Sequence, residues 1–157
     1  MLSEVLESIN KDTPLIVEIK PEGNRAWVNE TCSLAYDELK QHQNRYCIES
    51  FDPLAVNWFK KNAPGVIRGQ LSMSRKKYVG NTKATTAFML QNLLFSFLSR
   101  PHFIAYDYED NGLSLLISRL LGAMIVRWTV KSQALHDTLQ PKSDGIIFEG
   151  YSPSNSW

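Results

Sequence analysis

Short apolar runs alternate along the chain with longer segments of helical periodicity. The runs are rich in β-branched, aliphatic and aromatic residues and lie at residues 15–19, 46–51, 66–72, 103–108, 125–130 and 145–150. In the first of them, Leu15, Ile16, Val17 and Ile19 form an almost continuous apolar stretch, which is typical of a strand buried on both faces in a parallel sheet. Pro21 and Gly23 then end this strand.

Helical patterns fill most of the intervals between these predicted strands. We expect an amphipathic helix from about Arg25 to Gln43, with Trp27, Leu34 and Leu39 among its apolar positions. Other helices are expected from Asp52-Pro53 to Ala63-Pro64-Gly65, at 88–98, around Leu113 to Leu121, and after Ser132 through Leu135 to Leu139. The alternation of strand and helix predicts an α/β fold with a parallel sheet and right-handed crossovers.

The number of strand–helix units indicates an incomplete barrel. About six units are visible, whereas a complete (β/α)₈ barrel has eight and typically about 250 residues. Adding two units of roughly 30 residues each to this chain gives about 217 residues, which is within the range of such barrels. No repeat or linker is visible, so we expect a single domain over residues 1–157, with a polar tail at 151–157.

Composition and charge narrow the class of protein. The chain has 157 residues, 43% of them hydrophobic and 21% charged, with a net charge of +1, which is typical of a soluble globular protein and gives no reason to expect nucleic acid as a partner. Cys32 and Cys47 form neither a disulfide framework nor a CxxC metal motif. The N-terminus lacks the layout of a signal peptide, and we therefore expect a cytoplasmic protein.

Two charged residues interrupt the first apolar run. Alternation along a strand places Glu18 and Lys20 on the same side, at the strand's carboxyl end. Burying a carboxylate and an ammonium is costly unless something offsets it. The pair is therefore either a structural ion pair or part of a polar site at the mouth of a parallel sheet, where α/β proteins bind ligands.

Six ordered segments resemble the glycerophosphodiester phosphodiesterase family, and most closely a bacterial branch of it. They are EIKPEG (18–23), ESFDP (49–53), PGVIRGQLS (64–72), FIAYDY (103–108), RWTV (127–130) and DGIIFEG (144–150), and the match runs from about Leu2 to Gly150. The resemblance implies a TIM-type (β/α) barrel, present here as about strands three to eight of eight. It also implies metal-dependent hydrolysis of phosphoric diesters in glycerophospholipid metabolism.

The resemblance assigns roles to three residues and implies a cofactor. By its E-x-K motif, Glu18 would ligate a divalent cation, Mg²⁺ or Ca²⁺, and Lys20 would contact the phosphate of the substrate. By its W-T-V motif, Trp128 would line the substrate pocket, and the alternative is simple packing in the core. Such chemistry needs a cation and a fixed positive charge against the phosphate oxygens, and both ions prefer carboxylate oxygen.

The sequence also departs from the family pattern. Family members begin with a His-Arg-Gly strand, a Glu in an E-N-T-like segment, and an E-x-D strand followed by a second His, none of which is present in this sequence. The two histidines are the family's general acid and base, and His42, His102 and His136 match neither of them. We therefore expect no catalytic residue in this chain and negligible hydrolysis by it alone. The alternative is a remnant or binding module that still holds a phosphate or phospholipid headgroup through Lys20.

Three further polar residues are candidates for substrate binding, and each has a structural alternative. Glu49 would either face the site near Glu18 or point toward the helix layer. Gln70 could bind a glycerol hydroxyl, and Asp107 could either serve the site or cap a helix. Glu149, on the last predicted strand, is expected to be structural.

Two other features bear on partners. Arg75, Lys76, Lys77 and Lys83 follow the third strand, and this segment is either a merely solvated loop or one that attracts an anionic substrate or makes weak contact with a membrane surface. The strands at 15–19 and 145–150 would be edges of an open barrel, with few protective charges. We therefore expect self-association through these edges, or pairing with a missing N-terminal segment.

Overall fold

The structure, a computed structural model, divides the chain into two compact units. It describes residues 2–21, 24–74, 93–94, 96–109 and 113–154. The first unit comprises Met1–Gln70 and Ser96–Pro101, and the second comprises Leu71–Phe95 and His102–Trp157.

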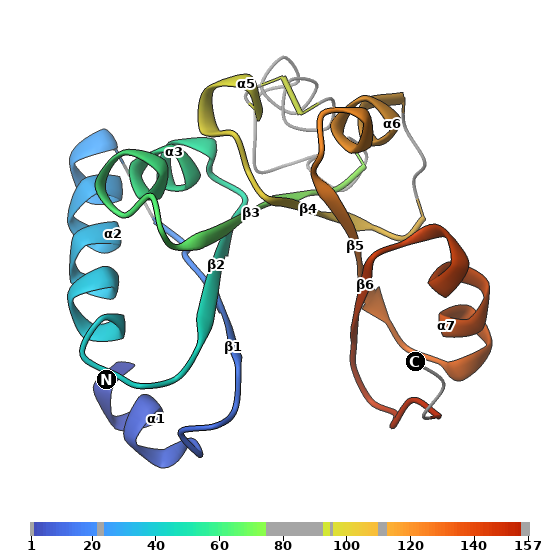
Figure 1. Cartoon of the computed structure of the whole chain (residues 1–157), viewed down its shortest axis with the longest axis horizontal. Helices are drawn as coiled ribbons and strands as arrows, with labels where there is room; N and C mark the ends of the chain where they lie inside the picture. The colour runs from blue at the N-terminus through green and yellow to red at the C-terminus, as the bar shows by residue number, and fades with distance from the viewer. Residues whose placement is uncertain (1, 22–23, 75–92, 95, 110–112, 155–157) are drawn as a thin grey trace. The chain divides into compact units, whose positions relative to one another are not determined.

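The first unit is built on parallel strands, as the alternating pattern predicted. Its elements are α1 (Leu2–Ser8), β1 (Leu15–Glu18), α2 (Arg25–Leu39), β2 (Tyr46–Ser50), α3 (Pro53–Asn62), the first four residues of β3 (Ile67–Ser72), and α5 (Ser96–Ser99). β1 pairs in parallel with β2, and β2 pairs in parallel with β3. In Figure 1, α2 and α3 lie beside each other on one side of β1 and β2. β1 and β2 therefore each connect to the following strand through a crossover helix, α2 and α3 respectively.

The core of this unit lies between these helices and the strands. Its fully buried members come from α1, α2, α3, β2 and the residue after β1: Leu6, Ile19, Val28, Cys32, Leu39, Ile48, Ala55, Phe59 and Ala63. Phe59 is the largest of them and contacts the rings of Tyr36 and Trp58 edge-on, at centroid distances of 6.2 and 5.0 Å. The side of β1 and β2 that carries Ile19 and Ile48 thus faces the helices, and alternation turns the neighbouring residues to the opposite side.

Both crossover helices of the first unit begin at a side-chain cap. The Asn24 side chain accepts hydrogen bonds from the backbone N–H groups of Ala26 and Trp27, at the start of α2. Asp52 accepts from the N–H of Leu54 at 2.8 Å and precedes Pro53 in the first turn of α3, as the sequence predicted. These caps fix where the chain turns from strand to helix.

The apolar residues expected in α2 do not all face the core. Leu39 is buried, but Trp27 is 57% exposed and Leu34 is 61% exposed. The buried stripe of the helix consists of Val28, Cys32 and Leu39. Counting apolar residues therefore overestimated the width of the face that α2 packs against the strands.

The second unit repeats the parallel arrangement. It contains β4 (Phe103–Asp107), α6 (Leu113–Leu120), β5 (Met124–Val130), α7 (Gln133–Leu139), the 3₁₀ turn η2 (Gln140–Lys142) and β6 (Gly145–Phe148). β5 pairs in parallel with both β4 and β6, and its register with β6 shifts between Arg127 and Val130. The predicted strand boundaries are thus confirmed to within one or two residues.

The ends of the helices in the second unit follow familiar rules. α6 ends at Leu120, and Gly122 in the following turn has a φ of +87°, which suits glycine. The N–H groups of Gly122 and Ala123 donate to the carbonyls of Arg119 and Ser118. Ser132 caps α7 through a 3.4 Å hydrogen bond from the N–H of Leu135, as predicted. Tyr151, in the predicted polar tail, packs against Phe148 and against His136.

Two predictions fall largely outside the described residues. Of the apolar helix expected at 88–98, the structure describes only residues 93–94 and 96–98, and it places a helix at Ser96–Ser99. The basic residues Arg75, Lys76, Lys77 and Lys83 lie outside the described part of the chain. Among the helices that are described, none is long and apolar enough to cross a bilayer.

Candidate functional site

The polar pair that interrupts the first apolar run lies at the carboxyl end of β1. Lys20 Nζ is 3.1 Å from Glu18 Oε2, which confirms that the two side chains share one side. The Lys20 side chain is 74% exposed and that of Glu18 is 29% exposed. An ammonium this exposed is worth little as a structural ion pair but is accessible to an anion in solution.

A second carboxylate lies directly beside the first. Glu49 is the register partner of Glu18 across the parallel pair of β1 and β2, and it is only 7% exposed. Burial, and secondarily the neighbouring Glu18 carboxylate, raise the pKa of Glu49 to about 7. Register partners on parallel strands point to the same face, so Glu49 lies on the side of Glu18 and away from the helices that cover Ile19 and Ile48.

Backbone and side-chain hydrogen bonds hold the two strand ends together. The N–H of Ile19 donates to the carbonyl of Glu49 at 2.8 Å, and Ser50 Oγ donates to the carbonyl of Ile19 at 2.6 Å. Ser50 Oγ also accepts from the N–H of Asp52 at 3.0 Å, which ties this junction to the start of α3. Sequence reasoning did not single out Ser50, and its position one residue after Glu49 in a strand was the only available signal.

Gln70 is close to this site in the fold but lies on the other face of the sheet. Its register partner is Ser50, while the partner of Glu49 on β3 is Gly69. Gln70 Nε2 donates to the carbonyls of Ser50 and Phe51, at 3.0 and 3.1 Å. The Gln70 amide nitrogen therefore supports the turn between β2 and α3, and its suggested role toward a glycerol hydroxyl stays a prediction.

Asp107 and Trp128 meet each other in the second unit. They are register partners at the carboxyl ends of β4 and β5, and the N–H of Tyr108 donates to the carbonyl of Trp128 at 3.1 Å. Asp107 is 3% exposed, and its Oδ1 accepts from the N–H of Glu109 at 3.0 Å. Asp107 thus closes a local turn after β4, and α6 begins only at Leu113.

The three histidines lie at positions that suit packing. His42 follows α2 in the turn before β2, and His102 directly precedes β4, so both are at the amino ends of strands. His136 is buried in α7, where its Nδ1 is 2.8 Å from the hydroxyl of Tyr151. Sites in parallel barrels lie at the carboxyl ends of the strands, and none of the histidines is at such an end.

The donor atoms at the strand ends bear on the cation that the family resemblance implies. Within the described ranges, no group of three or more His, Cys, Asp or Glu side chains could hold a metal ion. However, Glu18 Oε1 and Glu49 Oε2 are both buried and accept no hydrogen bond from any described residue. These two oxygens fit a hard divalent cation chemically, although they fill only part of its coordination shell.

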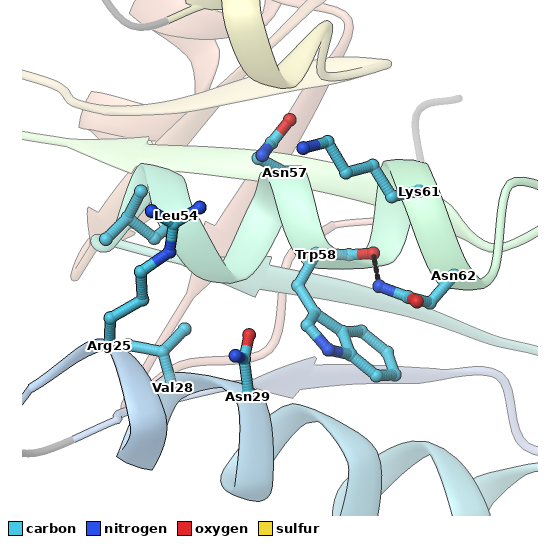
Figure 2. Close-up of a pocket in the computed structure, with 8 residues that line it drawn as sticks. All are labelled: Arg25, Val28, Asn29, Leu54, Asn57, Trp58, Lys61 and Asn62. Carbon is cyan, nitrogen blue, oxygen red and sulfur yellow. Dashed lines mark hydrogen bonds between the residues drawn. The ribbon is translucent and has the colours of Figure 1, made fainter.

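A separate pocket lies in the helix layer of the first unit, between α2 and α3 (Figure 2). Its volume is about 170 Å³, and its lining residues are Arg25, Val28, Asn29, Leu54, Asn57, Trp58, Lys61 and Asn62. None of the predicted site residues is among them. At this size the pocket is smaller than the ~300–1,000 Å³ of typical small-molecule sites.

Comparisons with known proteins give a clear result for structure and none for sequence. No family model matches the chain, and no curated protein matches it either. A phosphodiesterase of Oleispira antarctica, solved with the product sn-glycerol-3-phosphate, superimposes with a TM-score of 0.64 at 16% identity, over 87% of this chain and 51% of that one.

Two further solved structures agree. A protein of Silicibacter pomeroyi that is assigned as a glycerophosphoryl diester phosphodiesterase gives a TM-score of 0.68 at 17% identity, over 94% of this chain and 52% of that one. The glycerophosphodiester phosphodiesterase of Thermotoga maritima gives 0.63 at 18% identity, over 94% of this chain and 58% of that one. The chain therefore has part of the parallel (β/α) barrel fold of the glycerophosphodiester phosphodiesterases, and it spans about half the length of those structures.

Proposed function

We propose that the chain recognises the phosphate of a glycerophosphodiester at the carboxyl ends of β1 and β2. The observation that carries this proposal is the Lys20–Glu18 pair, at the end of a strand in a fold shared with phosphodiesterases. One of those similar structures contains sn-glycerol-3-phosphate, the kind of molecule that hydrolysis of a glycerophosphodiester releases. The family roles assigned to Glu18 and Lys20 fit this location.

Each charged group would act on a different part of the ligand. The exposed ammonium of Lys20 would pair with a phosphate oxygen, and a point charge of this kind is a common phosphate contact. A divalent cation held near Glu18 would supply further positive charge to the phosphate oxygens. Asp107 and Trp128, which are register partners at the ends of β4 and β5 in the second unit, stay predicted substrate-binding residues.

Recognition is favoured over turnover because the two acid–base histidines of the family pattern have no counterpart in this sequence. Hydrolysis of a phosphodiester needs a proton donor to the leaving alcohol and a base for the attacking nucleophile. None of the three histidines lies at the carboxyl end of a strand. The chain would therefore act as the phosphate-binding part of a metal-dependent phosphodiesterase whose acid–base groups come from elsewhere, or as a binding module without activity.

Calorimetric titration with sn-glycerol-3-phosphate tests the proposal. Lys20→Ala should abolish binding, because it removes the phosphate contact. Lys61→Ala is the matched control, since Lys61 is an exposed lysine of the same unit that lines the pocket between α2 and α3. Loss of binding in the Lys61 variant and not in the Lys20 variant would place the anion in that pocket and overturn the proposal.

A hydrolysis assay separates recognition from turnover. With glycerophosphocholine and Mg²⁺ or Ca²⁺, we expect negligible turnover by the chain alone. Rates near the ~1–10³ s⁻¹ of ordinary enzymes would show that an acid–base residue has been overlooked. If a segment carrying the His-Arg-Gly and E-x-D strands restores turnover when added, the enzymatic assignment is favoured over the binding module.

A further inference from the structure

We propose that Glu49 joins Glu18 as a ligand of a divalent cation, in a two-carboxylate site that the phosphate of the bound ligand completes. The family motifs place a metal ligand at Glu18 but none at the position of Glu49. Only the role of the phosphate in this inference rests on the proposed function. The two carboxylates belong to this chain whatever the ligand is.

The first argument is the geometry of the two strands. Glu18 and Glu49 are register partners, and neighbouring parallel strands lie about 4.8 Å apart, so both carboxylates start from adjacent positions on one face. The bond between the N–H of Ile19 and the carbonyl of Glu49 fixes this register immediately beyond the pair. Two carboxylates so placed can bind one ion together.

The second argument is which oxygen atoms remain available. Lys20 Nζ takes Oε2 of Glu18 at 3.1 Å, and Oε1 of Glu18 is buried with no hydrogen bond among the described residues. Oε2 of Glu49 is likewise buried with no hydrogen bond among the described residues, and Glu49 as a whole is more than nine-tenths buried. A buried carboxylate oxygen without a partner is costly, and a cation shared by the two residues would relieve that cost for both.

The third argument is the residue beside the pair on β3. Gly69 is the register partner of Glu49 on β3 and has no side chain to fill the face next to it. The longer side chain of Gln70 lies in register with Ser50, on the opposite face. Position 69 of β3 therefore adds no side chain to the face that carries the two carboxylates.

The ligand set points to a hard cation such as Mg²⁺. Mg²⁺ commonly keeps several waters and is held by one or two carboxylates together with phosphate oxygens of the substrate, so two glutamates are sufficient. Zn²⁺ also accepts carboxylate oxygen, but its protein sites are usually built on thiolate or imidazole.

Direct ion binding tests this inference without any assay of activity. Mn²⁺ serves as the probe, because the electron paramagnetic resonance signal of the free ion is lost when the ion binds to the protein. Competition by Mg²⁺ then shows that both ions use the same site. We expect one Mn²⁺ per chain, and about a tenfold or greater loss of affinity in both Glu18→Gln and Glu49→Gln. Glu30→Gln is the matched control, because Glu30 is exposed on α2 of the same unit, and its affinity should be unchanged. Thermal unfolding of each variant would confirm that it is folded.

Adding sn-glycerol-3-phosphate separates this inference from the proposed function. In the wild type the phosphate should tighten Mn²⁺ binding, and Lys20→Ala should remove that enhancement while leaving binding of Mn²⁺ alone in place. If Mn²⁺ binds but the phosphate has no effect, the cation site stands and the proposed function fails. If the wild type binds no Mn²⁺, or Glu49→Gln binds it as tightly as the wild type, the inference is overturned.

Discussion

Glu18 and Glu49 face the same side of two adjacent parallel strands, as register partners with no residue between them. Glu49 is almost completely buried, whereas Glu18 is partly exposed and paired with Lys20. Burial together with the neighbouring carboxylate therefore raises the pKa of Glu49 to about 7, from an ordinary value of 4.5. The folded chain retains a proton on Glu49 over a range of pH in which the unfolded chain has lost it.

This difference predicts how stability varies with pH in the absence of divalent cations. The stability associated with the protonated Glu49 is fully present below about pH 4.5 and is lost as the pH rises through about 7, since the folded state then loses its proton as well. A shift of this size corresponds to at most about 3 kcal/mol. Glu49→Gln, which cannot ionise, should therefore be more stable than the wild type at pH 8 and close to it at pH 4.5.

Urea unfolding with a chelator present, at several pH values between 4.5 and 8, measures this difference. Glu30→Gln again serves as the control, because an exposed glutamate should show no such dependence. If the wild type and Glu49→Gln keep the same stability difference at every pH, burial and the neighbouring Glu18 do not raise the pKa of Glu49.

Phe59 should be the most sensitive position in the core of the first unit. It is completely buried and contacts Tyr36 and Trp58, so truncation leaves a cavity between α2 and α3 that these rings cannot fill. We expect Phe59→Ala to reduce the free energy of unfolding by about 3–5 kcal/mol. Phe97→Ala, at a position that is 70% exposed, should change it by less than about 0.5 kcal/mol. Equal effects of the two variants in urea unfolding would contradict this packing.

The strands could be predicted because each apolar run is long enough to define one and is followed by a recognisable stop. Asp52-Pro53 and Ser132 placed two helix starts correctly, since capping depends on local residues alone. The burial of α2 could not be predicted in the same way. Trp27 and Leu34 are apolar but face away from the strands, and only the position of the helix on the sheet determines which side is covered.

The geometry of the candidate site could also be predicted only in part. Alternation within one strand was enough to place Glu18 and Lys20 together. The side on which Glu49 and Gln70 lie depends on the register between strands, and a shift of one residue would have exchanged them. For that reason the sequence alone could not distinguish Glu49 from Gln70 as a candidate site residue. The structure places only Glu49 beside Glu18.

Gln70 gives a test of this difference in position. Because its amide nitrogen donates to the carbonyls of Ser50 and Phe51, Gln70→Ala should destabilise the chain by about 1–3 kcal/mol. Gln41→Ala is the matched control, since Gln41 donates to the carbonyl of Asp37 on the exposed surface and its loss should cost far less. If Gln70→Ala instead keeps full stability in urea unfolding but weakens binding of sn-glycerol-3-phosphate, its role is toward the ligand.

The outer face of α6 leads to a prediction about self-association. Leu113, Leu116 and Leu120 recur at helical spacing along this face, and they are 71%, 56% and 78% exposed. Soluble monomers rarely expose a contiguous apolar face of this kind. A second copy of the chain could cover it without burying a charge, because Arg119, the basic residue of α6, is paired with Asp144 at 3.1 Å.

We therefore expect the chain to self-associate at micromolar concentration, with α6 contributing alongside the strand edges that the sequence suggested. Sedimentation velocity should show the wild type as more than one species. The double variant Leu116→Lys with Leu120→Lys should shift toward monomer, because two lysines on each copy would repel across the interface. Leu34→Lys is the control, since Leu34 is an exposed leucine of α2 and not of α6, and its replacement should leave the distribution unchanged. A wild type that remains a single monomeric species over this range would show that the exposed face of α6 is tolerated without a partner.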